Sequence, residues 1–591
     1  MNELLKRTNM CGELRIENAG REVVLNGWVQ RSRRLGGIIF SDLRDKTGIV
    51  QIVFDEDVPE EVFKTAEGLR NEYVVGIRGR VRERESKNPE LKTGDVEILA
   101  QELVIYSEAE TPPIYVKDDD NVDENLRLKH RYIDLRKLKM QQNLAFRSYV
   151  YRITREYFTN NGFIEVETPI LVKPTPEGAR DYLVPSRISK GSFYALPQSP
   201  QMYKQLLMAS GCDRYFQIAK CFRDEDLRAD RQPEFTQIDL EMSFVTVDDV
   251  IKVQEGFLAA LMKETKGIEL QLPMPRLSFK EAMDRFGSDK PDTRFGIELK
   301  NISDHVKDSD FVVFSHAVKS GGSVRGICAP GASSLYSRKD LDKLTETCRA
   351  YGAKGLAWMR VADEGLSTSF SKFFSEDDLT SLAELFGAKQ GDLVLIVADK
   401  DKVVYQTLGF LRCELAEKLG LIGDQAEERY DFLWVTDFPL FEEDDYGGLS
   451  AKHHPFTSPD PGDTDLLETD PLKVRALAYD IVLNGNEIGG GSIRIHDREL
   501  QRRMFKALGL SDEEVQEKFG FLLEAFRYGV PPHGGLAYGL DRLVMLLLGE
   551  NSIRETIAFP KNQAAEDPVS GAPGEVDDDQ LEELGLRLSS K

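Results

Sequence analysis

The chain has few cysteines and no pattern that would join them. Its six cysteines stand apart, and no two of them form a CxxC pair. This spacing argues against a disulfide scaffold and against a cysteine zinc site, and it is typical of reduced thiols in a cytoplasmic protein. The six positions are Cys11, Cys212, Cys221, Cys328, Cys348 and Cys413.

Long hydrophobic runs are also missing. The N-terminal residues MNELLKRTNMCGEL lack the apolar core that signal peptides carry. The apolar run at 543–548 is far too short to span a bilayer. We therefore expect a soluble, cytoplasmic protein with no membrane contact.

Positive charge is in deficit, because the formal net charge is -24. That balance argues against a protein that coats nucleic acid, although one local basic surface remains compatible with it. The phosphate-binding loop GxxxxGK[ST] is absent, so a nucleotide site here would need arginines and metal-binding carboxylates. The length of 591 residues is enough for about four domains.

The N-terminal 108 residues read as a β-barrel. Five strand candidates, at 23–29, 37–43, 49–54, 73–80 and 96–100, are separated by turn residues. One helix candidate, near 60–71, follows the third strand. This order predicts a five-stranded oligonucleotide-binding (OB) barrel.

Basic and aromatic residues occur together in this barrel, and we expect Trp28 to pack in its core. Aromatic rings stack on unpaired bases and arginines bind phosphates, although a purely solvated arginine face is the alternative. The residues of this kind are Trp28, Arg31, Arg33, Arg34, Phe40, Arg44 and Gln51.

Two strands joined by a charged loop are predicted at 214–244. The period of two puts Gln217, Cys221 and Arg223 on one face of the first strand. It puts Phe235, Gln237, Asp239 and Glu241 on one face of the second. Burying charged side chains on such a face costs free energy unless a ligand or a partner residue neutralises them. A solvated sheet face is the alternative, but the long, charged loop at 224–234 favours a functional site.

This stretch resembles motif 2 of the class II aminoacyl-tRNA synthetases, and specifically their aspartyl members. The resemblance implies that Arg223 holds the α-phosphate of ATP and that Phe235 stacks on adenine. The helix at 143–160 and the strand that reaches Pro169 resemble motif 1, which implies a homodimer; an ordinary edge-strand proline is the alternative. The stretch 534–548 resembles motif 3, and it implies that Arg542 binds the γ-phosphate at a helix end that favours anions.

A tight hairpin with Asn484-Gly485 at its tip is predicted at 478–489. Its register pairs Val482 with Glu487 and places Asp480 on the same face as Glu487. Two such carboxylates suit Mg²⁺; the alternative is a polar sheet face, and the resemblance favours the metal. Strict alternation would put Arg494 on the face opposite to Glu487, but a bulge at the glycines 489–491 would return Arg494 to the same face as Glu487.

The resemblance supplies the remaining site residues. It implies that Arg494 binds the side-chain carboxylate of aspartate. The implied aspartate pocket is Glu177, Ser199, Gln201, Lys204, Arg223, Asp239, His453 and Arg494. The implied ATP site is Arg223, Glu225, Gln232, Phe235, Glu487, Gly539, Leu540, Asp541 and Arg542, with Asp480 and Glu487 as the metal pair. The implied anticodon readers are Arg31, Phe40 and Gln51.

The expected fold is multidomain α+β, with an OB-fold barrel and a class II antiparallel catalytic sheet that holds an inserted α/β domain. The expected domains are an anticodon-binding barrel at 1–108, a hinge at 109–140, a catalytic domain at 141–295 and 430–563, a bacterial-type insertion at 296–429 and a tail at 564–591.

The sequence predicts ATP-dependent attachment of L-aspartate to tRNA(Asp) through an aspartyl-adenylate, with Mg²⁺. The alternatives are an asparaginyl-tRNA synthetase, a non-discriminating enzyme that also charges tRNA(Asn), an asparagine-forming ligase, and a non-catalytic RNA-binding relative. Lys204 and Arg494 favour a carboxylate over an amide as the side chain bound. The barrel argues against the ligase, and the presence of Arg223 and Arg542 argues against a non-catalytic protein.

Overall fold

The computed structural model describes residues 4–118, 121–174, 178–362, 365–422, 429–443 and 447–589. The chain divides into two compact units. The first holds Met1–Tyr149, Asp226–Pro233 and Val544–Glu582, and the second holds Val150–Glu225, Glu234–Leu543 and Glu583–Lys591.

Five strands of the first unit close into a barrel in the order β1-β2-β3-β5-β4, as predicted. The helix α1 (Glu60–Glu67) follows the third strand, and short 3-10 turns, η1 (Cys11–Glu13) and η2 (Ile16–Asn18), precede the barrel. The apolar side chains that alternate along the strands fill its interior. The strands are β1 (Glu22–Leu35), β2 (Ile38–Asp45), β3 (Gly48–Phe54), β4 (Val74–Glu83) and β5 (Val96–Ser107).

A bulge in β1 decides which side chains face outward. The register against β2 shifts between Val29 and Arg31. Because the extra residue reverses the alternation, Val29 is buried in the core and Arg31 is exposed. The expectation that Trp28 packs in the core was wrong. It is adjacent to the inward-facing Val29, so its ring lies outside the barrel, under the guanidinium of Arg136 at 5.4 Å.

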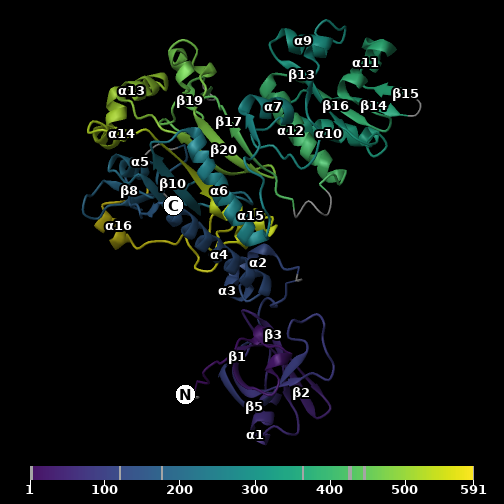
Figure 1. Ribbon diagram of the computed structural model, residues 1–591, viewed down its shortest axis with the longest axis vertical. Coiled ribbons are helices and arrows are strands. Elements are labelled where there is room, and N and C mark those ends of the chain that lie inside the picture. Colours follow the sequence, from purple (N-terminus) through teal and green to yellow (C-terminus); the bar gives the residue numbers. More distant parts are fainter. Residues whose placement is uncertain are drawn as a thin grey trace. The chain divides into compact units, whose positions relative to one another are not determined.

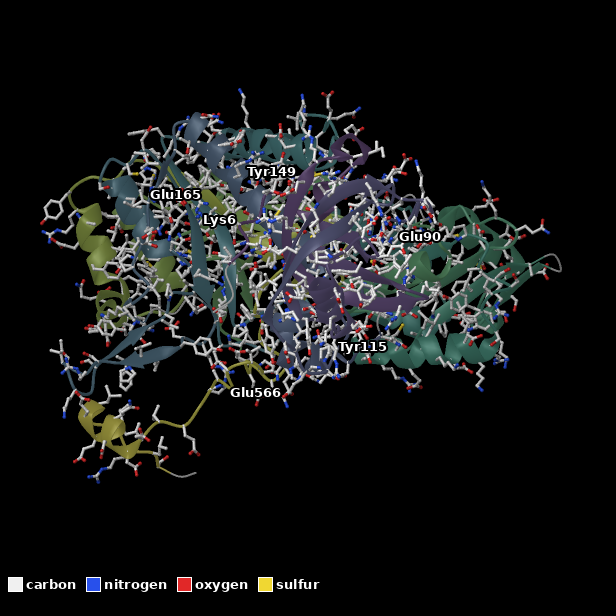
Figure 2. All side chains as sticks on the ribbon, turned by 90° about the horizontal axis from the view of Figure 1, so that it is seen from below. Lys6, Glu90, Tyr115, Tyr149, Glu165 and Glu566 are labelled. Carbon is white, nitrogen blue, oxygen red and sulfur yellow. The ribbon has the colours of Figure 1, made fainter. Side chains whose placement is uncertain are left out.

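The residues that follow the barrel pack against the helices that come next in the chain. Ile114, Val116 and Ile133 form a small buried cluster, whereas Tyr115 is 60% exposed (Figure 2). Asp123 caps the first of these helices by accepting hydrogen bonds from two backbone N–H groups. The helices are α2 (Glu124–Lys129), α3 (Arg131–Asp134) and α4 (Leu138–Asn160), and the last begins earlier than predicted.

An eight-stranded sheet forms the centre of the second unit, in the order β11-β17-β20-β21-β22-β10-β9-β6. Its inner strands pair antiparallel, and only the outermost pairs, β11 with β17 and β6 with β9, are parallel. The strands are β6 (Ile164–Glu165), β9 (Arg214–Phe222), β10 (Glu234–Ser243), β11 (Arg276–Ser278), β17 (Phe432–Thr436), β20 (Ala478–Leu483), β21 (Asn486–Ile493) and β22 (His533–Gly539). The strand predicted to reach Pro169 is short and lies at the sheet edge.

Helices cover this sheet, and α6 begins with a capping box in which Thr246 and Asp249 bond each other's backbone N–H. Phe257 of α6 packs on Tyr538 of β22, with ring centroids 5.4 Å apart. The helices are α5 (Gln201–Ala209), α6 (Val247–Lys266), α7 (Phe279–Phe286), α13 (Arg498–Ala507), α14 (Asp512–Phe526) and α15 (Leu540–Leu548). Two small hairpins, β7 (Leu183–Pro185) with β8 (Phe193–Ala195) and β18 (Phe441–Glu443) with β19 (Leu449–Ala451), form separate two-stranded sheets.

Residues 300–418 alternate strands and helices around a sheet of their own, in the order β12-β13-β16-β14-β15 (Figure 1). All of its pairs are antiparallel. Helices α10 and α12 share one apolar cluster with it, and α8, α9 and α11 share another. The elements are β12 (Lys300–Asn301), α8 (Ser303–Val306), α9 (Val312–Lys319), β13 (Ser323–Ala329), α10 (Arg338–Ala350), β14 (Ala357–Ala362), β15 (Gly365–Thr368), α11 (Glu376–Phe386), β16 (Leu393–Asp399) and α12 (Asp401–Lys418).

The C-terminal stretch carries one short helix, α16 (Asp578–Leu584), as predicted. Within the described part of the chain, no helix has both the length and the hydropathy that crossing a bilayer requires.

Candidate active site

The β9–β10 hairpin has the two faces that the sequence predicts. Phe235 pairs with Cys221, and Asp239 pairs with Gln217. The guanidinium of Arg223 lies 5.2 Å from the centroid of the Phe235 ring. The Arg223 Nε is buried, and no described residue accepts a hydrogen bond from it. A buried donor of this kind is an available partner for an anion.

The β20–β21 hairpin also has the predicted tip and register. Asn484 and Gly485 both have positive φ, at 49° and 79°, as a type I′ turn requires. Val482 pairs with Glu487, but Ile481 pairs with Gly489, so Ile488 is the extra residue of a bulge. The bulge lies one residue before the glycines, and it places Arg494 on the same face as Glu487.

Two carboxylates converge beside Gly490. A Cβ placed on Gly490 would lie 2.5 Å from Asp480 Oδ1 and 3.7 Å from Glu487 Oε1. Burial and the charge of Glu487 raise the pKa of Asp480 well above its ordinary value. The described residues contain no cluster of three or more metal ligands. Two carboxylates nevertheless fit Mg²⁺, which retains waters and binds substrate phosphates.

The start of α15 lies against these strands. Arg542 Nη1 donates to the backbone oxygen of Glu487 at 2.6 Å, so the predicted phosphate arginine and the metal pair are brought together. Asp541 accepts a hydrogen bond from the Thr236 backbone N–H at 2.7 Å. The Leu540 side chain is fully buried, so only its backbone is available to a ligand, and Gly539 pairs with Gln237 in the sheet.

Four buried charges form the centre of the site. Lys204 Nζ lies 2.7 Å from Asp239 Oδ1 and 3.5 Å from Glu241 Oε2. Arg494 donates to Glu241 through Nε at 3.0 Å and Nη2 at 3.3 Å, and to Ser492 Oγ through Nη1 at 2.6 Å. Burial alone would raise the pKa of Glu241, but Arg494 and Lys204 hold it below its ordinary value.

Three of these groups were predicted, and Glu241 was not assigned to the site. The sequence places Glu241 on the same strand face as Asp239, and that signal was sufficient to include it. Gly535 makes room for it, since a Cβ there would lie 2.1 Å from Glu241 Oε2. Ser492 and His454 were also missed. Burial lowers the pKa of the His454 imidazole, and the charges of Arg494 and Lys204 lower it further.

Three residues of the predicted aspartate pocket have buried polar atoms that no described residue satisfies. Asp239 Oδ2, Gln201 Nε2 and His453 Nε2 are buried and have no hydrogen-bond partner among the described residues. Ser199 Oγ accepts from the Gln201 backbone N–H at 3.3 Å. Such groups are usually satisfied by water or ligand when they occur in a native site.

His453 is half-buried and packs edge-on against Phe438, with ring centroids 4.7 Å apart. Burial, and then the charges of Lys452 and Arg494, lower the pKa of its imidazole to about 4. His453 is therefore neutral at physiological pH, and it presents one N–H and one acceptor nitrogen.

The loop before α5 is held by Gln198. Its amide bonds both backbone groups of Ala179, at 3.1 Å and 2.9 Å, and Asp181 Oδ1 at 2.6 Å. The predicted Glu177 lies outside the described residues. Glu225 is half-buried just after β9. Gln232 belongs to the first unit, where its amide bonds the Lys561 backbone at 3.0 Å and 2.7 Å.

The barrel brings the three predicted anticodon readers to one face. Phe40 and Asp42 lie two residues apart on β2, Asp42 pairs with Arg31, and Gln51 also pairs with Asp42. The Gln51 amide is held by Glu97 and Arg84, at 2.8 Å and 3.1 Å. Phe40 is half-buried, and the guanidinium of Arg33 lies 5.7 Å from its ring centroid.

Comparison with known families gives two matches. Residues 123–563 match the model described as tRNA synthetases class II (D, K and N). Residues 23–106 match the model described as OB-fold nucleic acid binding domain.

Similar proteins match over almost the whole chain. A Thermoanaerobacter pseudethanolicus protein named aspartate–tRNA(Asp/Asn) ligase is 57% identical over 99% of this chain and 98% of its own length. A Clostridium botulinum protein named aspartate–tRNA ligase is 55% identical over 99% of this chain and 98% of its own length.

Among solved structures, the fold is similar to the Pyrococcus horikoshii asparaginyl-tRNA synthetase complexed with asparaginyl-adenylate. The TM-score is 0.58 at 20% identity, and the match covers 94% of this chain and 98% of that one. The Entamoeba histolytica asparaginyl-tRNA synthetase gives a TM-score of 0.57 at 18% identity over 93% and 97%. At these identities the likeness concerns the fold alone.

Proposed function

Because the chain belongs to the class II tRNA synthetases of the aspartyl, lysyl and asparaginyl group, we propose that it attaches aspartate to tRNA in two steps. The carboxylate of aspartate attacks the α-phosphorus of ATP in line to give aspartyl-adenylate and pyrophosphate. A hydroxyl of the terminal ribose of tRNA then attacks the carbonyl carbon of the adenylate, which forms the aspartyl ester and releases AMP. No enzyme nucleophile is needed, so catalysis depends on positioning and on charge stabilisation.

The buried cluster of Lys204, Asp239, Glu241 and Arg494 supports aspartate most directly. Glu241 occupies only one edge of the Arg494 guanidinium. The terminal nitrogens retain hydrogens for a bidentate contact with the substrate's side-chain carboxylate. Asp239 Oδ2 has no hydrogen-bond partner among the described residues, which supports a role as acceptor for the substrate ammonium.

Several residues are assigned to ATP. Arg223 binds the α-phosphate, with Phe235 against adenine, and Arg542 binds the γ-phosphate. Asp480 and Glu487 would hold Mg²⁺, which when bound neutralises charge on the phosphates. Ser199, Gln201 and His453 complete the amino-acid pocket. Glu177, Glu225, Gln232, Gly539, Leu540 and Asp541 remain proposed from the resemblance.

The barrel is proposed to read the anticodon through Arg31, Phe40 and Gln51. The relatives bear two names, one for the aspartate tRNA alone and one for both tRNAs, so charging of tRNA(Asn) as well is the second candidate activity. The test is charging of purified tRNA(Asp) and purified tRNA(Asn) with labelled aspartate and ATP. Aspartate on tRNA(Asp) supports the proposal, aspartate on both defines a non-discriminating enzyme, and label on neither contradicts it.

We also propose that the protein is a cytoplasmic homodimer. Ile164 lies in the edge strand β6, and Ile170 and Leu171 follow that strand. These side chains are 57%, 51% and 52% exposed, which is the kind of apolar surface that a partner covers. Light scattering at micromolar concentration should give twice the 66.8 kDa chain mass; a monomer would contradict the dimer.

The domain boundaries predicted from the sequence belong to the same proposal, with residues 296–429 as an insertion.

A further inference from the structure

A cavity of about 260 Å³ lies on the outer side of the barrel, within the first unit. Four cationic side chains line it: Arg7 from the N-terminal segment, Arg44 from β2, Lys46 from the β2–β3 turn and Arg136 from the residues between α3 and α4. Trp28 of β1 also lines it. We refer to it as the cationic cavity.

The cations of the cavity outnumber the carboxylates that meet them. Arg44 and Arg136 share one carboxylate, Glu72, at 2.9 Å and 2.8 Å. Arg7 donates to the backbone oxygen of Asn26 at 2.6 Å. No ion pair joins Arg7 or Lys46 to a described carboxylate.

Among the described residues, Asp45 is the one carboxylate that lines the cavity, and its oxygens accept hydrogen bonds from the backbone. It accepts from the Cys11 N–H at 2.7 Å and from the Thr47 N–H at 2.8 Å. These bonds fix the turn that carries Lys46. With Asp45 and Glu72 counted against four cations, the wall keeps an excess of two positive charges, on a chain whose net charge is -24.

Trp28 adds a donor without a partner. Its indole Nε1 is buried, and no described residue accepts its hydrogen bond. The ring is held in place by the Arg136 guanidinium on its face, at 5.4 Å. An oxyanion would accept a hydrogen bond from this buried N–H and would also neutralise the cations that form no ion pair with a described carboxylate.

The cavity continues the outer face of β2. Phe40, Asp42 and Arg44 alternate along one side of that strand, and Trp28 pairs with Arg44. From Phe40 to Arg44 the strand rises roughly 13 Å. A single strand of RNA lying along β2 therefore reaches both the aromatic ring at one end and the cations at the other.

We propose that the cationic cavity binds one backbone phosphate of the tRNA, next to the nucleotides that the barrel reads. This inference rests on the proposed function, because it takes the bound RNA to be tRNA. A phosphate supplies a charge for Arg7 and Lys46 and an acceptor oxygen for the Trp28 N–H. The contact carries affinity and no base information.

The test uses the full-length protein and measures tRNA binding by fluorescence anisotropy between about 50 and 300 mM potassium chloride. The variants are Arg7→Gln and Lys46→Gln, and the matched control is Lys64→Gln, an exposed lysine on α1 away from the cavity. We expect each cavity variant to lower the slope of log Kd against log salt by about one, because one phosphate contact is lost. The control should keep the parent slope.

Trp28→Phe separates the donor from the ring. Phenylalanine is smaller than tryptophan, keeps an aromatic face for Arg136 and lacks the N–H donor, so we expect a Kd increase of about threefold to tenfold at low salt. Thermal melts of every variant check folding. Exchange of pyrophosphate into ATP with aspartate should stay at the parent rate, because the cavity takes no part in adenylate formation.

Unchanged slopes for both Arg7→Gln and Lys46→Gln would overturn the proposal. If the slopes are unchanged and titration calorimetry shows pyrophosphate binding to the parent that Lys46→Gln abolishes, the cavity serves a free polyphosphate and the RNA assignment is wrong. Failure of the proposed function is distinct, since the parent would then charge no tRNA at any salt concentration.

Discussion

Glu241 is the residue on which the cations of the amino-acid pocket depend. It is fully buried, and it bonds Arg494 at 3.0 Å while lying 3.5 Å from Lys204. The two cations are therefore compensated before substrate binds. Rejection of asparagine must then rest on donor geometry, because the hydrogens of Arg494 and Lys204 find no acceptor on an amide NH₂.

Glu241→Gln should raise the KM for aspartate in ATP–pyrophosphate exchange, with a smaller fall in kcat. The neutral amide holds Arg494 less firmly, so the guanidinium is less well oriented for the substrate carboxylate, and we expect a loss of about 2–4 kcal/mol in kcat/KM. Glu255→Gln, at a buried glutamate of α6 whose carboxylate accepts the Met274 N–H, is the matched control. An unchanged KM for aspartate would show that Glu241 only fills space.

His453 gives the site a pH dependence whose sign is fixed by burial. Its pKa is lowered to about 4 in the folded protein, below the unfolded value of about 6.5. The unfolded chain therefore binds the extra proton first, and stability falls as the pH drops from about 6.5 towards 4.

His453→Gln should remove part of that fall. The loss of unfolding free energy between about pH 7 and pH 5 should be smaller in the variant by about 1–2 kcal/mol. Denaturant titrations at the two pH values measure it. If parent and variant lose stability equally, the His453 imidazole is not kept neutral by the fold.

At the scale of the element, the sequence contains most of what positions the site. Alternation along β10 and the Asn484-Gly485 tip gave the correct faces, and glycine content near Gly490 indicated the bulge. The expectation that Trp28 packs in the core failed, because alternation along β1 does not say which set of alternate side chains points into the barrel. The convergence of Lys204, Glu241 and Arg494 from three elements is tertiary, and no local pattern in the sequence measures such a distance.

Gly535 tests whether the sheet is built around the buried carboxylate. A Cβ there would lie 2.1 Å from the Leu240 backbone oxygen and 2.1 Å from Glu241 Oε2. Gly535→Ala should lower the free energy of unfolding by about 1–3 kcal/mol or more, because backbone must move. Gly574→Ala, at a position with open space around it, is the control. Equal melting temperatures for the two variants would contradict the close packing at Gly535.

At the scale of the whole molecule, RNA reading is proposed for the barrel, and adenylate formation is proposed for the site on the eight-stranded sheet. Phe40→Ala should weaken tRNA charging and leave ATP–pyrophosphate exchange unchanged, because the ring lies on the barrel, where we propose that it stacks on a base of the tRNA. Loss of one stacked base costs about 1–3 kcal/mol. Charging kinetics at varied tRNA concentration measure the effect. If exchange falls in step with charging, Phe40 supports the fold and does not read RNA.

The central claim is that the pocket selects aspartate through Arg494. The most direct measurement is ATP–pyrophosphate exchange with aspartate and with asparagine, in the parent, Arg494→Lys and Arg494→Leu, with thermal melts to confirm folding. Lysine keeps the charge but lacks the planar fork. We expect kcat/KM for aspartate to fall by a factor on the order of 10³ or more in Arg494→Leu and by less in Arg494→Lys. The ratio of kcat/KM for aspartate to that for asparagine should fall in both variants. A folded Arg494→Leu protein that keeps the parent's full preference for aspartate would contradict the account.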